Sequence, residues 1–149
     1  MTVLAALVVF ALDRLVKIVV MNNMTCGQSI EVLPKIFHIT LIFNTGTAFG
    51  LFQRANLLLV FLSIAAITVI LIYIAAHKYL RPGLAIALGL LLGGALGNLF
   101  DRIKFGNVID FLDFRIWPVF NIADSALTIG MIILGWHTLV QGSKRKTQN

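Results

Sequence analysis

The chain has 149 residues, of which 59% are hydrophobic and only 12% are charged, and its mean hydropathy is +0.95. Soluble domains have about 45 to 50% apolar and about 25% charged residues, so this composition excludes a water-soluble exterior and indicates a single membrane-embedded domain. The net charge of +6 does not favour nucleic acid as a partner, because the basic residues are scattered along the chain. Their one cluster, residues 144–146, directly follows an apolar stretch, a position that suits contact with anionic lipid headgroups.

Four apolar stretches are long enough to cross a hydrocarbon core of about 30 Å, which takes about 20 helical residues. They cover about residues 1–21, 55–76, 83–100 and 122–140. The first has no basic leader and no small-residue cleavage site, and it carries Asp13, Arg14 and Lys17, so it is a mature helix rather than a signal peptide. The sequence therefore predicts an all-α membrane protein with four transmembrane helices.

The long connection at residues 22–54 is predicted to form a β region. Residues 36–44, IFHITLIFN, alternate and are rich in β-branched and aromatic side chains, which is typical of a strand. Pro34 before this run and the Asn44 to Gly46 segment after it supply turn residues. Residues 111–117, FLDFRIW, are predicted to form another short extended piece, so we expect a small extracytoplasmic β-sheet.

Four spans place both termini on one side of the membrane, together with Lys78, Arg81 and the basic tail at 141–149. The positive-inside rule makes that side cytoplasmic. The opposite side carries as many bases, but three of them are interleaved with aspartates, which indicates local pairing. Asp13, Asp101 and Asp124 are then all expected to lie at the outer leaflet.

Five of the six acidic residues are aspartates inside or at the edge of a predicted span: Asp13, Asp101, Asp110, Asp113 and Asp124. A charge within a membrane costs at least about 2.5 to 3.5 kcal/mol, so such residues either serve function or form ion pairs that hold helices together. Asp13 has Lys17 four residues later on the same helix face, and Asp101 is followed by Arg102. We therefore interpret Asp13, Lys17 and Asp101 as structural or orienting residues.

Asp110 and Asp124 differ, because neither has a basic residue within four positions and both lie among apolar residues, in VIDFL and NIADSAL. Burial would raise the pKa of both carboxyl groups, and close approach would leave the pair with one shared proton near neutral pH. That protonation state is the one in which an aspartic peptidase works. Asp110 and Asp124 are the predicted catalytic residues, and no cofactor is expected.

Other chemistries find little support in the sequence. There is no HExxH motif, and His38, His77 and His137 fall in separate parts of the chain, so neither a metal site nor a serine peptidase site is expected. Two alternatives remain open. The aspartates could form a relay for proton-coupled transport, or the chain could be a non-catalytic membrane scaffold.

Five motifs occur in one order along the chain: DRLVK at Asp13, NTGTAFG at Asn44, GGALGNLFDR at Gly93, GNVIDF at Gly106, and FNIADS at Phe120. In these motifs the chain resembles the signal peptidase II family of aspartic peptidases. The resemblance implies a four-helix bundle with a small sheet and a catalytic pair at Asp110 and Asp124. It also implies that Asn44, Asn98, Arg102 and Asn121 shape the site and hold substrate. Asn121 could equally cap the fourth helix, and Gly46 is expected to allow a turn.

The resemblance further implies the substrate, a lipoprotein precursor that carries a diacylglyceryl group on a cysteine and is cut on the N-terminal side of that cysteine. The expected location is the bacterial cytoplasmic membrane, with the site towards the outer leaflet, membrane lipids as neighbours, no nucleic acid, and a monomeric enzyme. Two departures stand out. The chain starts almost directly in its first apolar stretch, and only residues 111–123 separate the two aspartates, so the hairpin above the site is expected to be reduced.

Overall fold

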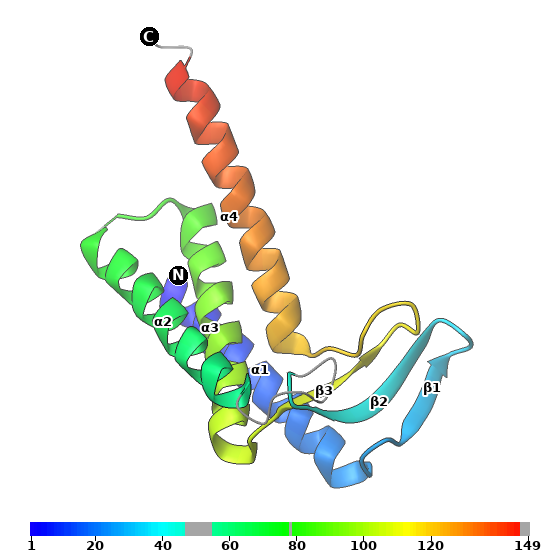
Figure 1. Ribbon diagram of the computed structural model, residues 1–149. Helices are drawn as coiled ribbons and strands as arrows, with labels where there is room; N and C mark the ends of the chain where they lie inside the picture. Colours follow the sequence, from blue (N-terminus) through cyan, green and yellow to red (C-terminus); the bar gives the residue numbers. More distant parts are fainter. Residues whose placement is uncertain (47–54, 78, 147–149) are drawn as a thin grey trace.

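The computed structural model describes residues 1–46, 55–77 and 79–146, and the last four residues of the NTGTAFG motif lie outside these ranges. The elements in chain order are α1 (Thr2–Asn23), β1 (Ser29–Leu33), β2 (Phe37–Asn44), α2 (Ala55–Ala76), α3 (Pro82–Phe105), β3 (Val108–Asp113) and α4 (Ile122–Lys146). The chain is mostly helical, and the strands lie together at one end of the helices (Figure 1).

The central helix of the bundle is α3, which packs against α1, α2 and α4. Its glycines allow two of these neighbours to approach closely. A methyl group on Gly93 would lie 2.6 Å from the backbone oxygen of Ala6 in α1, and one on Gly94 would lie 2.6 Å from the backbone oxygen of Ala123 in α4. Small residues at such crossings let helix backbones pack tightly within a membrane.

Within the described residues, three helices are long and apolar enough to cross a membrane, over Asn56–Ala76, Pro82–Phe105 and Ile122–Leu139. These segments belong to α2, α3 and α4. The first helix is equally long but carries Asp13, Arg14 and Lys17. A multi-pass membrane protein with a small sheet is therefore the observed architecture.

The sheet is antiparallel, with the strand order β1-β2-β3. Its inner face packs on α1 through a cluster of buried residues that includes Val20, Leu41, Ile109 and Phe111. In the β2–β3 pairing, Asp110 lies opposite Ile42, next to an irregularity in the register. The packing on α1 therefore fixes β3, and with it Asp110, against the ends of the helices.

The predicted strand at 36–44 is confirmed by β2, and Gly46 has a positive φ of 73° just after it. The extended piece predicted at 111–117 is wrong in its bounds, because β3 begins at Val108 and ends at Asp113. Residues 108–110 pair with the end of β2 and are buried, and that tertiary pairing is invisible in local sequence.

Two helices are longer than their apolar stretches predict. The third continues through the polar segment after residue 100 to Phe105, where Gly106 adopts a left-handed conformation with φ of 74°. The fourth continues to Lys146, so residues 141–146 of the basic tail are helical. Arginine and lysine, which occur in both extensions, favour helix, so backbone hydrogen bonding carries both helices past the end of the predicted apolar stretch.

Candidate active site

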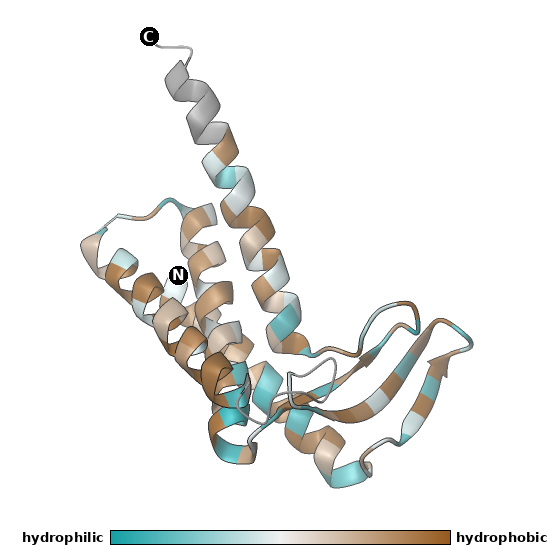
Figure 2. Cartoon of the chain, viewed as in Figure 1, coloured by the Kyte–Doolittle hydropathy of each residue, from teal (hydrophilic) through white to brown (hydrophobic). Residues whose placement is uncertain are grey.

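Hydrophilic residues of the helices gather near the sheet, whereas apolar residues dominate the remainder of α2 and α3 (Figure 2). Several of these polar side chains are buried, namely Asp13, Lys17, Asn98, Asp101, Asp110 and Asn121. Buried polar groups require partners, since each unpaired one costs free energy. Two connected groups of side chains supply those partners.

The first group surrounds Asp110, which β3 places at the ends of the helices. Its side chain is buried, and both carboxylate oxygens accept a hydrogen bond. Asn44 donates through Nδ2 to Oδ2 at 2.8 Å, and Asn121 donates through Nδ2 to Oδ1 at 2.7 Å. Burial and the nearby charge of Asp124 raise the pKa of Asp110 to about 6, although both amide donors and Lys17 act in the opposite direction.

Asp124 is held at the start of α4 by a reciprocal cap with Asn121. The Asn121 side-chain oxygen accepts the backbone N–H of Asp124 at 2.9 Å, and Asp124 Oδ2 accepts the backbone N–H of Asn121 at 3.2 Å. This is a capping box with aspartate at the third helical position. The other carboxylate oxygen, Oδ1, accepts Nδ2 of Asn98 in α3 at 2.7 Å.

Two asparagines connect the carboxylates. Asn121 donates to Asp110 and caps the turn that contains Asp124, and its Nδ2 also lies 3.1 Å from the side-chain oxygen of Asn98. The structure thus brings together Asn44, Asn98, Asp110, Asn121 and Asp124, five residues that the sequence analysis selected. For Asn121 the two alternatives of that analysis coexist, because the same side chain both caps α4 and contacts Asp110.

Arg102, on α3, is half-buried and interacts electrostatically with Asp124, Asp110 and Asp101, the strongest interaction being with Asp124. Its backbone oxygen accepts a bond of 3.4 Å from Asn56 of α2. The cation therefore attracts both carboxylates and can offset their mutual repulsion.

The second group contains four charged side chains, two cations and two anions, whose charges sum to zero. Lys17 Nζ lies 2.8 Å from Asp13 Oδ2 and 2.7 Å from Asp101 Oδ2, and Arg14 Nη2 lies 2.6 Å from Asp101 Oδ1. The predicted pairing of Asp13 with Lys17 is confirmed. Asp13 also accepts the backbone N–H of Ala123 at 3.1 Å, and so ties α1 to the first turn of α4.

The expected pairing of Asp101 with Arg102 is wrong. Asp101 pairs with Arg14 and Lys17 of α1, and its Oδ2 also accepts the backbone N–H of Ile109 at 3.2 Å. Consecutive residues on a helix point in different directions, so adjacency in sequence is poor evidence for a contact. Arg14 has no role among the sequence-based predictions, although its position within DRLVK is a usable signal.

Asn44 and Gly46 form a turn at the open edge of the site. The Gly46 N–H donates to Asn44 Oδ1 at 2.8 Å, which leaves the Asn44 amide nitrogen directed at Asp110. The positive φ of Gly46 favours glycine, and a side chain there would collide with Leu59 of α2. Both residues are exposed, so this turn lies at the surface of the protein.

Asp113, the other aspartate of β3, lies apart from this group. It accepts Thr40 Oγ1 at 2.8 Å and pairs with Arg115 at 3.2 Å. Burial raises the pKa of Asp113, but the hydrogen bonds from Thr40 and Arg115 outweigh it and hold the pKa below its usual value.

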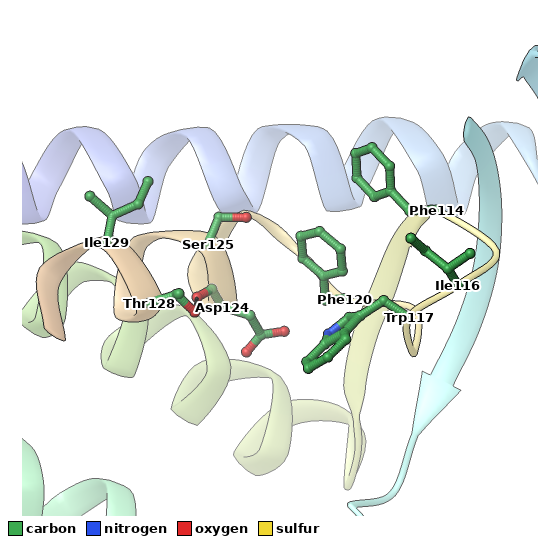
Figure 3. A pocket seen from close by; sticks show the side chains of 8 residues that line it. All are labelled: Phe114, Ile116, Trp117, Phe120, Asp124, Ser125, Thr128 and Ile129. Atoms are coloured by element: carbon green, nitrogen blue, oxygen red, sulfur yellow. Dashed lines mark hydrogen bonds between the residues drawn. The ribbon is translucent and has the colours of Figure 1, made fainter. Parts of the chain in front are cut away.

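A largely apolar pocket of about 500 Å³ adjoins Asp124 (Figure 3). On one side it is lined by Phe114, Ile116, Trp117 and Phe120 of the connection that precedes α4, and on the other by Asp124, Ser125, Thr128 and Ile129. The pocket follows α4 for more than one turn from the carboxylate. Its volume is within the usual range of small-molecule sites, and its lining suits an apolar group.

In the described ranges 1–46, 55–77 and 79–146, no three His, Cys, Asp or Glu side chains gather so that they could hold a metal ion. The two carboxylates of the site instead accept N–H groups from amides. Such donors fix the orientation of a carboxylate and leave it able to exchange a proton with a bound water.

Comparisons with known proteins agree on one family. A family model described as signal peptidase (SPase) II matches residues 5–140. A lipoprotein signal peptidase from Moorella thermoacetica is 47% identical over 145 residues, with 95% of each chain covered. One from Bacillus subtilis is 38% identical over 147 residues, with 96% of each chain covered. A solved bacterial membrane enzyme is 33% identical with a TM-score of 0.87, over 96% of this chain and 90% of that one.

Proposed function

The chain belongs to the signal peptidase II family and is an aspartic peptidase, and we propose that it removes signal peptides from lipoprotein precursors in the bacterial inner membrane. The proposed substrate carries a diacylglyceryl group on a cysteine and is cut on the N-terminal side of that residue. A substrate of this kind has a signal helix and acyl chains that are confined to lipid, so an enzyme at the membrane surface meets both at once.

The proposed catalytic pair is Asp110 and Asp124, acting with one shared proton. The ionised carboxylate takes a proton from a water molecule while the water oxygen bonds to the carbon of the scissile carbonyl. The protonated partner donates its proton to the carbonyl oxygen. Collapse of the tetrahedral intermediate then breaks the C–N bond, and a carboxyl proton passes to the leaving nitrogen. A pKa of about 6 for Asp110 supports a shared proton near neutral pH.

The amides take supporting roles in this mechanism. We assign Asn44, Asn98 and Asn121 to the orientation of the carboxylates, because each donates a side-chain N–H to one of them. The turn at Gly46 keeps Asn44 aimed at the site, and Arg102 limits the repulsion between the two acids. The group formed by Asp13, Lys17 and Asp101 is assigned to the framework that joins α1, α3 and α4.

We further propose that α1 also crosses the membrane, which makes one integral membrane domain of four spans. Its three charged residues fall in a group of two cations and two anions, so the charge buried there sums to zero. With four spans, both termini are cytoplasmic and the site lies towards the outer leaflet, in contact with membrane lipids. We propose that the enzyme works as a monomer.

The observation that carries this proposal is the asparagine connection between two carboxylates, with Asn121 in contact with Asp110 and capping the turn of Asp124. The test is cleavage of a diacylglyceryl-modified precursor by purified enzyme in liposomes. Asp110→Asn and Asp124→Asn should each lower kcat by about a thousandfold or more.

The matched control is Asp113→Asn, which removes a carboxylate from the same strand outside the site and should leave kcat unchanged. Comparison of lipidated and unlipidated precursors tests the substrate class. Substantial turnover by either site variant would refute the dyad, and equal cleavage of the two precursors would refute the dependence on lipid.

A further inference from the structure

Lys17 is fully buried on α1, and its ammonium group lies close to three oxygen atoms from different side chains. Two acceptors are the carboxylates of Asp13 and Asp101, at 2.8 and 2.7 Å. The third is the side-chain oxygen of Asn98, at 3.4 Å from Nζ. An ammonium group has only donors, so it attracts the Asn98 oxygen as it attracts the two carboxylates.

The third contact bears on Asn98, whose amide has an oxygen that accepts and a nitrogen that donates. Lys17 and Asn121 both donate to the oxygen, and the nitrogen donates to Asp124 Oδ1 at 2.7 Å. If the amide were rotated by half a turn, its NH2 group would face the ammonium of Lys17, and its oxygen would face the carboxylate of Asp124. Both contacts would then be repulsive, so Lys17 favours the one amide orientation that holds Asp124.

We propose that Lys17 is a positioning residue for the peptidase reaction, whose ammonium fixes the Asn98 amide so that it holds the Asp124 carboxylate in its working orientation. This inference rests on the proposed function of Asp124. It gives Lys17 a role beyond the neutralisation of Asp13 and Asp101, which a purely structural cation would fulfil equally well.

The chain contains a matched control in Arg14, one turn of the same helix away. Arg14 pairs with the same acids, at 2.6 Å from Asp101 Oδ1 and 3.7 Å from Asp13 Oδ2. Its guanidinium stacks over the ring of Phe100, 4.7 Å from the centroid. Within the described residues, the side-chain amide of Asn98 forms hydrogen bonds with Lys17, Asn121 and Asp124. The two cations therefore share the structural task, and Lys17 alone of the two contacts the amide.

Lys17 also acts on the charge of the site. Among the groups around Asp110, Asp124 raises its pKa, whereas Lys17 and the amides of Asn44 and Asn121 lower it, and Arg102 attracts both carboxylates. Loss of the ammonium should therefore move the acid limb of the pH–rate profile to higher pH.

The test uses two double variants with equal charge, Asp13→Asn with Lys17→Met and Asp13→Asn with Arg14→Met. Each leaves one cation against Asp101, so neither carries an unpaired buried charge that would prevent folding. Cleavage of the lipidated precursor is measured for both, with kcat and KM determined separately across the pH range, and thermal unfolding is measured in parallel.

The Lys17 double variant should lose about tenfold to a hundredfold in kcat relative to the Arg14 double variant, because a misplaced carboxylate slows the reaction while substrate binding remains. KM should stay within about threefold, and the acid limb should move upwards only in the Lys17 variant. Equal kcat values and superimposable pH profiles in two variants of similar melting temperature would overturn the proposal. Failure of the wild-type enzyme to cleave the precursor would instead overturn the proposed function.

Discussion

Replacement of Asp110 by asparagine should stabilise the protein at neutral pH while it removes the activity. The folded protein raises the pKa of this carboxyl from 3.8 to about 6, so ionisation of Asp110 opposes folding. A difference of roughly two pKa units corresponds to about 3 kcal/mol in the free energy of unfolding. The uncharged asparagine side chain would not lower the stability by this amount. Asparagine has only one side-chain oxygen to accept from the two amide donors, Asn44 and Asn121. The lost hydrogen bond reduces the gain in stability by about 1 kcal/mol. The expected net gain is about 2 kcal/mol above pH 6.

The sign of the pH dependence follows from the direction of the shift. Between the two pKa values the folded wild-type protein binds more protons than the unfolded chain, so its stability falls as the pH rises from about 4 to about 6. Thermal unfolding in detergent should show Asp110→Asn melting about 4 to 8 °C above wild type at pH 8, with the difference shrinking towards zero near pH 4.

Asp113 provides a control of opposite sign in the same strand. Hydrogen bonds hold the pKa of Asp113 below 3.8, so its ionised form stabilises the fold, and that stability is present above pH 3.8 and is lost as the pH falls. Asp113→Asn should therefore melt below wild type at pH 8 and approach it in acid. A stability difference for Asp110→Asn that does not change with pH, or that is negative at pH 8, would refute the burial argument.

Three further outcomes test the framework around the site. Asn121→Ala should lose about 1 kcal/mol more stability than Asn121→Ser, because serine keeps the cap of α4. Both variants should lose cleavage, because neither has the side-chain N–H that Asn121 donates to Asp110. Gly93→Ala should lower the melting temperature, because the added methyl group forces α3 away from α1 at a cost of about 1 to 3 kcal/mol. Gly135→Ala is the control: its methyl group meets nothing within 4 Å, so the variant should gain up to about 1 kcal/mol of stability. Asp13→Asn alone should cost about 3 kcal/mol or more by leaving an excess buried cation, and an unchanged melting temperature would contradict the structural role of that acid.

Much of the fold could be predicted from the sequence, because bilayer thickness and backbone hydrogen bonding leave few solutions for an apolar stretch of about 20 residues. The strand at 36–44 was also predictable from its alternation. The bounds of β3 were not, because residues 108–110 become a strand only by pairing with the end of β2. The ends of α3 and α4 were missed since a helix does not stop where its hydrophobicity stops.

The residues of the site could likewise be predicted where the signal lies in the neighbouring sequence, but not where it depends on tertiary contacts. Asp110 and Asp124 could be selected because each lacks a nearby base in the sequence. The partners of Asp101 could not, because its cations lie on another helix, and the adjacent Arg102 points elsewhere. The contact between Lys17 and Asn98 joins residues 81 positions apart, and only the packing of α1 on α3 creates it.

The arrangement of the two polar groups explains how a membrane enzyme can keep acidic side chains reactive. A carboxylate neutralised by a direct ion pair is stable but a poor proton acceptor, and Asp13 and Asp101 have that arrangement with Lys17 and Arg14. The site carboxylates are held by amides instead, which satisfy their oxygens without cancelling their charge. Lys17 acts on Asp124 through the neutral Asn98, so the ion-paired framework can orient the carboxylate while its basicity is preserved.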